Sequence, residues 1–378
     1  MNSPTITHIT FMNSSIKSSI LAIFCCVSSL AAAADALSSR NTNPALLYWQ
    51  AAAELPPLSD AQAKQLREVA GGKVDFKAEL IEELNFEWTV KFLRKAVASE
   101  APCEWGLALE EGIEAPTPHL AKMREFSTMA LVLAEAKFAK GETTAGIDLL
   151  LMAHHIARDA DAAPSLISNV IQNVLERRTI ATAARHCMSW DAAGREDYAR
   201  RLTLLPDLNP LPNAFATELV WIGAWEKELE ENFDQARKKF GLVASSEKSD
   251  PFRSPELIKE MLETYHKMHE RGMVILALEG EARRLAVAEF EKDMEADLTA
   301  KKRLPKNILV ALAMPALSNM VRGEDQSAIA QAMLKSALVH GPEISEKDLE
   351  GQPFKLVRKE GGWELSSNEL EFVLEFGR

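Results

Sequence analysis

Residues 124–160 read REFSTMALVLAEAKFAKGETTAGIDLLLMAHHIARDA, and this stretch decides the fold class. Two sets of mainly apolar residues in it recur every three or four positions, which places each set on one face of a helix. The first set is Phe126, Met129, Ala130 and Leu133, and the second is Ile147, Leu150, Leu151 and His154. The segment 140–144 between them reads as a turn, so the stretch predicts two antiparallel helices with a short link.

A third helix is expected to follow, opened by Pro164, because proline suits a first turn, where its missing N–H needs no partner. Its inward face is Ile167, Val170, Ile171 and Val174. Four small residues stand at roughly the spacing of a tetratricopeptide unit: Ala134, Gly141, Gly146 and Ala153. The signature tryptophan and tyrosine are missing. The chain is therefore predicted to be mainly α, an irregular stack of antiparallel helical hairpins that is only weakly tetratricopeptide-like.

Upstream of this core, Ser59 and Gln62 fit a capping box, and Gly71 and Gly72 are expected to end the helix that it opens. Residues 74–97 are predicted to form one further helix. Its buried stripe would be Leu80, Leu84, Trp88 and Phe92.

Downstream, residues 205–212 contain three prolines and are expected to be non-helical, so they mark a boundary between two helical regions. Ser254 and Pro255 are predicted to open a long charged helix over residues 256–301, with a break at Arg271 and Gly272.

The period changes near the C-terminus. Alternate residues are apolar over 370–376, and Gly361 and Gly362 precede them as a turn. This pattern predicts a small antiparallel β meander packed on the helices. The expected organisation is a leader over 1–34, an N-terminal helical region over 35–205, a second helical region over 206–345 and the meander over 346–378.

The leader has the parts of a secretory signal peptide. Lys17 gives a basic start, residues 20–27 form a short apolar run, and residues 30–36 end in small residues with cleavage expected after Ala33, Ala34 or Ala36. The alternatives are a buried apolar helix, a membrane anchor or a lipid on the Cys25–Cys26 pair. We expect an exported protein, periplasmic or extracellular, with no membrane span after leader cleavage.

The 378-residue chain carries a formal net charge of -12. Binding to nucleic acid needs clustered Lys and Arg, so this balance argues against a nucleic-acid partner and against anionic lipid surfaces. Cleavage of the leader would leave two of the four cysteines, Cys103 and Cys187. They either form a disulfide or remain buried free thiols.

Several stretches carry a family resemblance. They are Asn43–Ala51, Cys103–Gly106, Glu110–Gly112, Pro118–Leu120 with Arg124, Gly351–Lys355 and Gly361–Trp363. With them the chain resembles a family of exported, mostly helical proteins of environmental bacteria, although Leu356 or Val357 stands where the family often has tyrosine. The resemblance implies an exported helical architecture. It implies no activity, because none is established for that family.

Glu263, His266 and His269 are three residues apart and share a helix face, so they are the metal-ligand candidates. The alternative is the polar face of a charged helix, because no second Glu-x-x-His of this kind is found. His154 and His155 point about 100° apart on a helix, and His154 reads as a hydrogen-bonded core residue.

Four residues are candidates for ligand binding. Trp221 and Trp225 lie four apart beside the proline segment, and His119 and Arg124 lie near a proline-rich turn. Core packing and helix capping are the competing interpretations. No set of residues typical of catalysis and no cofactor motif is recognisable.

The leading hypothesis is therefore a non-enzymatic binding or scaffold protein of the cell envelope, whose partner is another envelope protein or a peptide segment. The alternative is a metal-dependent enzyme that uses Glu263, His266 and His269. The sequence leaves the oligomeric state open.

Overall fold

The computed structural model describes residues 41–378 except 83, 109–110, 112–114, 234, 236–254, 300–316, 342–346, 348–350, 368–369, 371 and 378. The predicted leader lies outside the described residues, as does the predicted cap Ser254. Its cleavage and the export that it implies therefore stay predictions.

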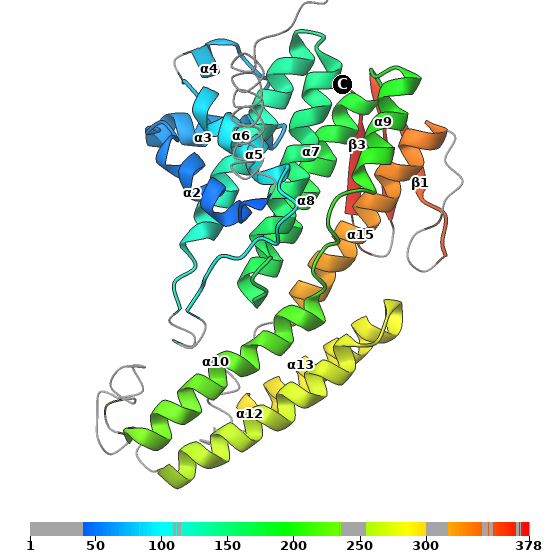
Figure 1. Ribbon diagram of the computed structural model, residues 1–378. Helices are drawn as coiled ribbons and strands as arrows, with labels where there is room; N and C mark the ends of the chain where they lie inside the picture. The colour runs from blue at the N-terminus through cyan, green and yellow to red at the C-terminus, as the bar shows by residue number, and fades with distance from the viewer. Residues whose placement is uncertain are drawn as a thin grey trace, which may run out of the picture.

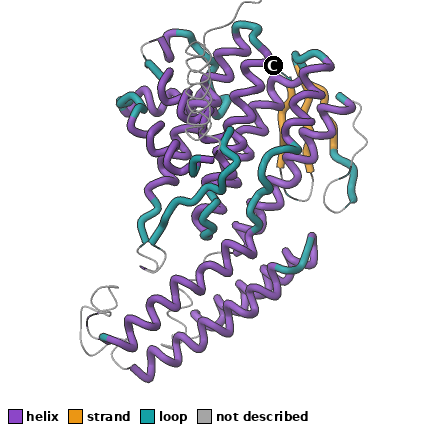
Figure 2. The backbone as a smooth tube through the Cα atoms, in the orientation of Figure 1, coloured by secondary structure: helices purple, strands orange, loops and turns teal. Residues whose placement is uncertain are grey.

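The protein is mainly α-helical, with a three-stranded antiparallel sheet at the C-terminus, as predicted (Figures 1 and 2). The helices are α2 (Pro44–Ala53), α3 (Asp60–Ala70), α4 (Glu79–Glu82), α5 (Glu87–Val97), α6 (Pro118–Ala139), α7 (Thr143–Ala160), α8 (Leu166–Cys187), α9 (Ala192–Leu202), α10 (Leu211–Glu231), α12 (Pro255–Leu276), α13 (Gly280–Thr299) and α15 (Leu317–His340). The strands are β1 (Lys355–Lys359), β2 (Gly362–Ser367) and β3 (Phe372–Phe376).

The hairpin predicted from residues 124–160 is confirmed as α6 and α7, which pack on each other. Gly141, which has a φ of 72°, lies in the turn between them. Phe126, Ile147 and Leu150 are buried as their spacing predicts. The following helix, α8, begins at Leu166 with Ser165 as its N-cap, so the prediction that Pro164 opens it is two residues early. The prediction that Ile167 faces inward is wrong, because its side chain is exposed.

The prediction of one helix over residues 74–97 is wrong. The segment forms the short α4 and then α5, and residues 84–86 between them are non-helical. The side-chain oxygen of Asn85 accepts the backbone N–H of Glu87 at 3.1 Å in a local turn just before α5, whose N-cap residue Phe86 makes no capping hydrogen bond with its side chain. As a result α5 buries Thr89, Leu93 and Ala96, while Trp88 is exposed.

The second helical region also differs in detail from the prediction. Helix α10 begins at Leu211 with Pro212 in its first turn, so only residues 203–210 are non-helical. The break in the long helix falls between α12 and α13 at residues 277–279, and Gly280 has a φ of 55°. Gly272 lies inside α12 instead, where the Phe215 ring packs against it.

Two buried apolar clusters hold the described part of the chain together. The larger one joins α2 to α9, the second half of α15 and the sheet. The smaller one joins α10, α12 and α13 with Leu317 and Val321 at the start of α15. Helix α15 therefore packs in both clusters, and Figure 1 shows it running from the lower helices into the upper body. The division into separate regions at 206 and 346 stays a prediction.

The meander packs against α8 and α15, and its strands follow the order β1-β2-β3. Leu365 pairs with Leu374 and Trp363 pairs with Phe376, whose rings stack at 3.9 Å. Leu365, Leu374 and Phe376 are buried, which confirms the alternating pattern. Among the described residues, no helix has the length and apolarity needed to cross a membrane.

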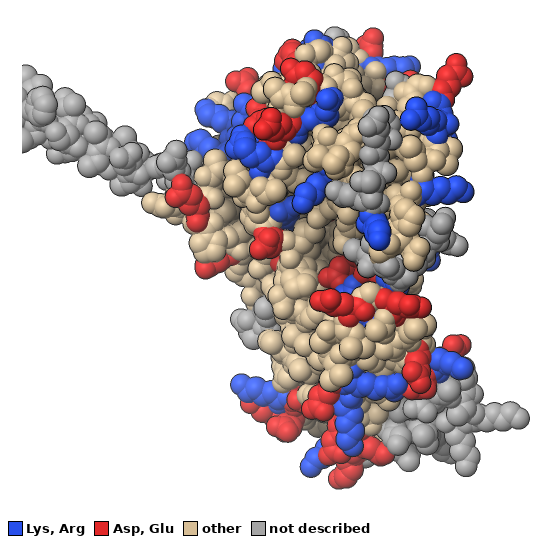
Figure 3. Space-filling model, turned by 90° about the vertical axis from the view of Figure 1, so that its right-hand side faces the viewer, with Lys and Arg blue, Asp and Glu red and all other residues tan. Residues whose placement is uncertain are grey.

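On the face drawn in Figure 3, acidic and basic side chains are interspersed at both ends of the molecule. Broad uncharged areas lie between them.

Two glycines within helices, Gly146 in the first turn of α7 and Gly223 in the middle of α10, give a test of the packing. A Cβ at Gly146 in α7 would lie 2.3 Å from the Phe138 ring, which is itself stacked on His186. A Cβ at Gly223 in α10 would meet nothing within 4 Å. We expect Gly146→Ala to lower the free energy of unfolding by about 1–2 kcal/mol, because overpacking outweighs the gain in helix propensity. Gly223→Ala should raise it by about 0.5–1 kcal/mol. Urea unfolding of both variants checks this, and equal shifts would contradict it.

Candidate functional site

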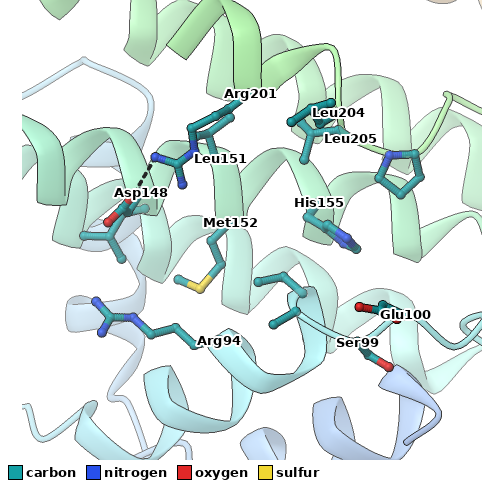
Figure 4. A pocket seen from close by; sticks show the side chains of 14 residues that line it. Arg94, Ser99, Glu100, Asp148, Leu151, Met152, His155, Arg201, Leu204 and Leu205 are labelled. Atoms are coloured by element: carbon teal, nitrogen blue, oxygen red, sulfur yellow. Dashed lines mark hydrogen bonds and ion pairs between the residues drawn. The ribbon is translucent and has the colours of Figure 1, made fainter. Parts of the chain in front are cut away.

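A hollow of about 790 Å³ in the described surface runs along α7. Its walls come from α5, from residues 97–100, from α7 and from the end of α9 with residues 204–206. A neighbouring hollow of about 610 Å³ shares Ser99, Glu100, His155 and Pro206 with it. We call the two together the α7 groove, and Figure 4 shows its larger part.

The floor of the α7 groove is apolar. Leu151 and Met152 are almost fully buried there, and Val97 and Leu205 are half-buried. Leu204, at the edge, is an apolar side chain that is 72% exposed. An exposed leucine beside an apolar floor is the kind of surface that an apolar ligand group covers.

The two ends of the groove differ in charge. Arg94 and the ion pair of Arg201 with Asp148, at 2.7 Å, lie at one end (Figure 4). Acidic groups line the other end and the neighbouring hollow: Glu100, Asp159, Asp161 and Asp207. Arg158 is also there, but its guanidinium is bound to the Glu176 carboxylate and donates to the Pro206 carbonyl. The groove is thus basic or neutral at one end and acidic at the other.

His155 lines both hollows of the groove, and the sequence analysis did not include it among the candidate site residues. Its Nδ1 lies 3.1 Å from the Asp159 carboxylate, which also accepts the Tyr48 hydroxyl at 2.6 Å. A carboxylate in this position orients an imidazole and fixes its tautomer. The spacing of His155 and Asp159, four residues apart on one helix, is the signal that would have found the pair.

Behind the groove, His154 is fully buried, as predicted. Its Nδ1 lies 2.8 Å from the Glu176 carboxylate, and its Nε2 lies 2.7 Å from the Tyr198 hydroxyl. Glu176 also binds Arg158 and accepts from Gln331 at 3.1 Å. This network joins α7, α8, α9 and α15 beneath the groove floor.

Burial changes the acidity of several groups around the groove. It raises the pKa of Asp161 to about 7, although hydrogen bonds from Ser168 and Asn169 oppose the shift. Burial and the neighbouring Asp159 carboxylate raise the pKa of the Cys103 thiol far above its usual value. Cys103 therefore stays a protonated thiol and is unsuited to act as a nucleophile.

The predicted ligand-binding residues are dispersed, and none of them lines the α7 groove. Trp221 is buried in α10, and Trp225 lies in the same helix, with its side chain outside the described set. His119 is buried and stacks on Trp105 at 4.5 Å, and burial lowers its pKa to about 4. Arg124 is exposed and borders a different hollow, between α3, α6 and α8.

The two histidines among the predicted metal ligands have other partners. His266 lies 2.5 Å from the Glu226 carboxylate, and His269 is buried against the Phe215 carbonyl, 2.7 Å away. In the described ranges no group of three His, Cys, Asp or Glu side chains is placed to hold a metal ion. Glu263, His266 and His269 therefore do not form the predicted site. Cys103 and Cys187 are both free thiols, so the alternative without a disulfide is the one found.

Comparison of the chain with protein-family models, with curated proteins and with solved structures gives no match. The family resemblance drawn from the sequence accordingly stays a prediction, and the candidate site has to be interpreted from its own geometry.

Proposed function

We propose that the protein is a non-enzymatic binding protein of the cell envelope, and that the α7 groove holds an extended segment of a partner protein. A single observation carries the proposal: the groove has an apolar floor, with Arg94 at one end and acidic side chains at the other. The export part of the proposal depends on the leader pattern in residues 1–36.

The lining of the groove defines the partner segment. Apolar side chains of the segment would cover Leu204 and the floor around Met152. A Lys or Arg of the segment would lie by Glu100 and Asp207, and an acidic residue would lie by Arg94, since charges across an interface are arranged to be complementary. This gives the segment one preferred direction in the groove.

The backbone beside the groove supports an extended ligand. Residues 99–103 and 205–209 border it and are non-helical. These segments lie outside any helical hydrogen-bond ladder, as in modes of peptide recognition that use extended segments, although the Pro206 and Asn209 carbonyls already accept hydrogen bonds from side chains of α7 and α8.

Selection of random dodecapeptides displayed on phage against the full-length protein tests the proposal. We expect enriched peptides to combine a Lys or Arg at one end, apolar residues in the middle and an acidic residue at the other end. Synthetic copies should bind the Leu204→Glu and Glu100→Lys variants at least about tenfold more weakly, a change that corresponds to roughly 1.4 kcal/mol.

Both substitutions are at exposed positions, so the fold should tolerate them. Leu285→Glu is the matched control, because Leu285 is also exposed but lies on α13, away from the groove. Peptide binding should be unchanged in that variant. No enrichment, or the same loss in all three variants, would refute the proposal.

A further inference from the structure

A second hollow, of about 390 Å³, lies between α3, α6 and α8 and shares no lining residue with the α7 groove. Most of its wall is apolar: Leu55, Leu58, Leu66, Phe86, Met129 and Leu175. Three arginines from three helices stand around it, namely Arg67 of α3, Arg124 of α6 and Arg178 of α8. We call this hollow the arginine-rimmed pocket.

The three arginines are exposed, so they lie at the rim and the apolar residues form the interior. They are also close enough to repel one another, because the neighbouring Arg124 and Arg67 add to burial in lowering the pKa of Arg178. Across the described ranges, none of the three forms an ion pair with an acidic side chain. Glu125, the acid that borders the pocket, is bound to Lys122 at 2.8 Å.

Several arginines elsewhere in the protein are paired with an acidic side chain. Arg158 pairs with Glu176, Arg185 pairs with Glu135, and Arg283 pairs with Glu324. The chain has 55 acidic residues to 43 basic ones. Three guanidinium groups without an acidic partner in the described part of the chain stand around this one apolar hollow, and an anion placed among them would offset their mutual repulsion.

We propose that the arginine-rimmed pocket binds a single-chain anionic amphiphile, with a carboxylate or phosphate head among the three guanidinium groups and an alkyl chain against the apolar wall. Arginine suits this head because its planar fork of N–H donors binds carboxylate and phosphate oxygens in pairs. The alkyl chain gains free energy by leaving water.

The volume of the pocket sets the length of the ligand's alkyl chain. A water-sized group takes up about 30 Å³, so a hollow of 390 Å³ accepts roughly a dozen groups of that size. Dodecanoate is therefore the probe of choice. The overall negative charge of the protein does not oppose this, because the head is bound by local charges within a Debye length of about 8–10 Å.

Isothermal titration of the full-length protein with dodecanoate, dodecyl phosphate and dodecanol, below their micellar concentrations, tests the proposal. We expect saturable binding of one dodecanoate or dodecyl phosphate per protein, and the tighter of the two identifies the head group. Dodecanol should bind at least about tenfold more weakly, because it has no charge for the guanidinium groups to bind.

Arg124→Gln and Arg178→Gln should each weaken binding of the anionic probe about tenfold or more, whereas the control Arg200→Gln, at an exposed position on α9, should leave it unchanged. Ala63→Phe should also prevent binding, since it fills the apolar part of the pocket and keeps all three arginines. Equal binding of dodecanol and dodecanoate, or unchanged binding in the pocket variants, would overturn the proposal.

Discussion

Replacement of Glu176 by alanine should lower the free energy of unfolding by about 3–5 kcal/mol, because it leaves buried partners uncompensated. The Glu176 side chain is fully buried and binds His154, Arg158 and Gln331. These partners come from α7 and α15, so the loss is expected to weaken the packing of both helices on α8. Urea unfolding followed by circular dichroism measures the change.

Glu125→Ala is the control for this experiment. Glu125 lies on α6 with its side chain 42% exposed and is paired with Lys122. Exposed ion pairs contribute little, so its loss should change stability by no more than about 1 kcal/mol. A shift below about 1 kcal/mol for Glu176→Ala as well would show that the buried network does not hold these helices together.

The contribution of the Glu176 carboxylate to the free energy of unfolding should also depend on pH. Burial raises the pKa of Glu176, but His154 and Arg158 outweigh it and hold the pKa below the usual 4.5. A lowered pKa in the folded state gives stability that is present above pH 4.5 and is lost as the pH falls through the folded value. Asp161 and Glu218, whose pKa values burial raises to about 7, titrate in wild type and variant alike. The stability difference between wild type and Glu176→Gln should therefore shrink in acid.

Replacement of Phe215 by alanine should cost about 3–5 kcal/mol, as expected for a large side chain removed from a packed interior. The Phe215 ring is 1% exposed. It stacks on the His269 ring at 4.2 Å and packs against Gly272. The backbone carbonyl of residue 215, which accepts from His269, remains in the variant. The stability lost in the variant therefore measures the contribution of the Phe215 side chain, which packs between α10 and α12.

Val220→Ala is the matched control, because Val220 lies on the same helix with 54% of its surface exposed. Its effect on unfolding should stay within about 0.5 kcal/mol. Amide hydrogen exchange gives the location of the effect of Phe215→Ala. Relative to wild type, we expect the variant to exchange faster in α12 and to change little in α6. A similar change in both helices would contradict the separate packing of the smaller apolar cluster.

The elements that the sequence predicted well are those with a local signal. The hairpin of α6 and α7 follows from spacings of three and four residues, and the meander follows from alternation over residues 370–376. The break between α4 and α5 was missed because the apolar period continues across it. At the break the Asn85 side chain accepts a hydrogen bond from the Glu87 backbone N–H, and periodicity does not record local bonds of this kind.

The candidate sites were harder to predict because their residues meet only in the folded chain. Arg94, Asp148 and Arg201 lie about fifty residues apart in sequence and border one end of the α7 groove. Arg67, Arg124 and Arg178 are just as widely spaced, and only Arg124 had been singled out. In contrast, the two histidines of α12 lie three residues apart as the sequence shows, but α10 supplies each of them with another partner.

The orientation of a peptide in the α7 groove is the most direct test of the central claim. A peptide from the selection is titrated by fluorescence anisotropy against wild type and Arg94→Glu, with its acidic end residue either kept or changed to lysine. We predict that each single change weakens binding about tenfold and that the two changes together restore most of the loss, because they reverse both charges of one contact. Independent losses that add up in the double change would contradict the claim that the charged ends of the groove orient its partner.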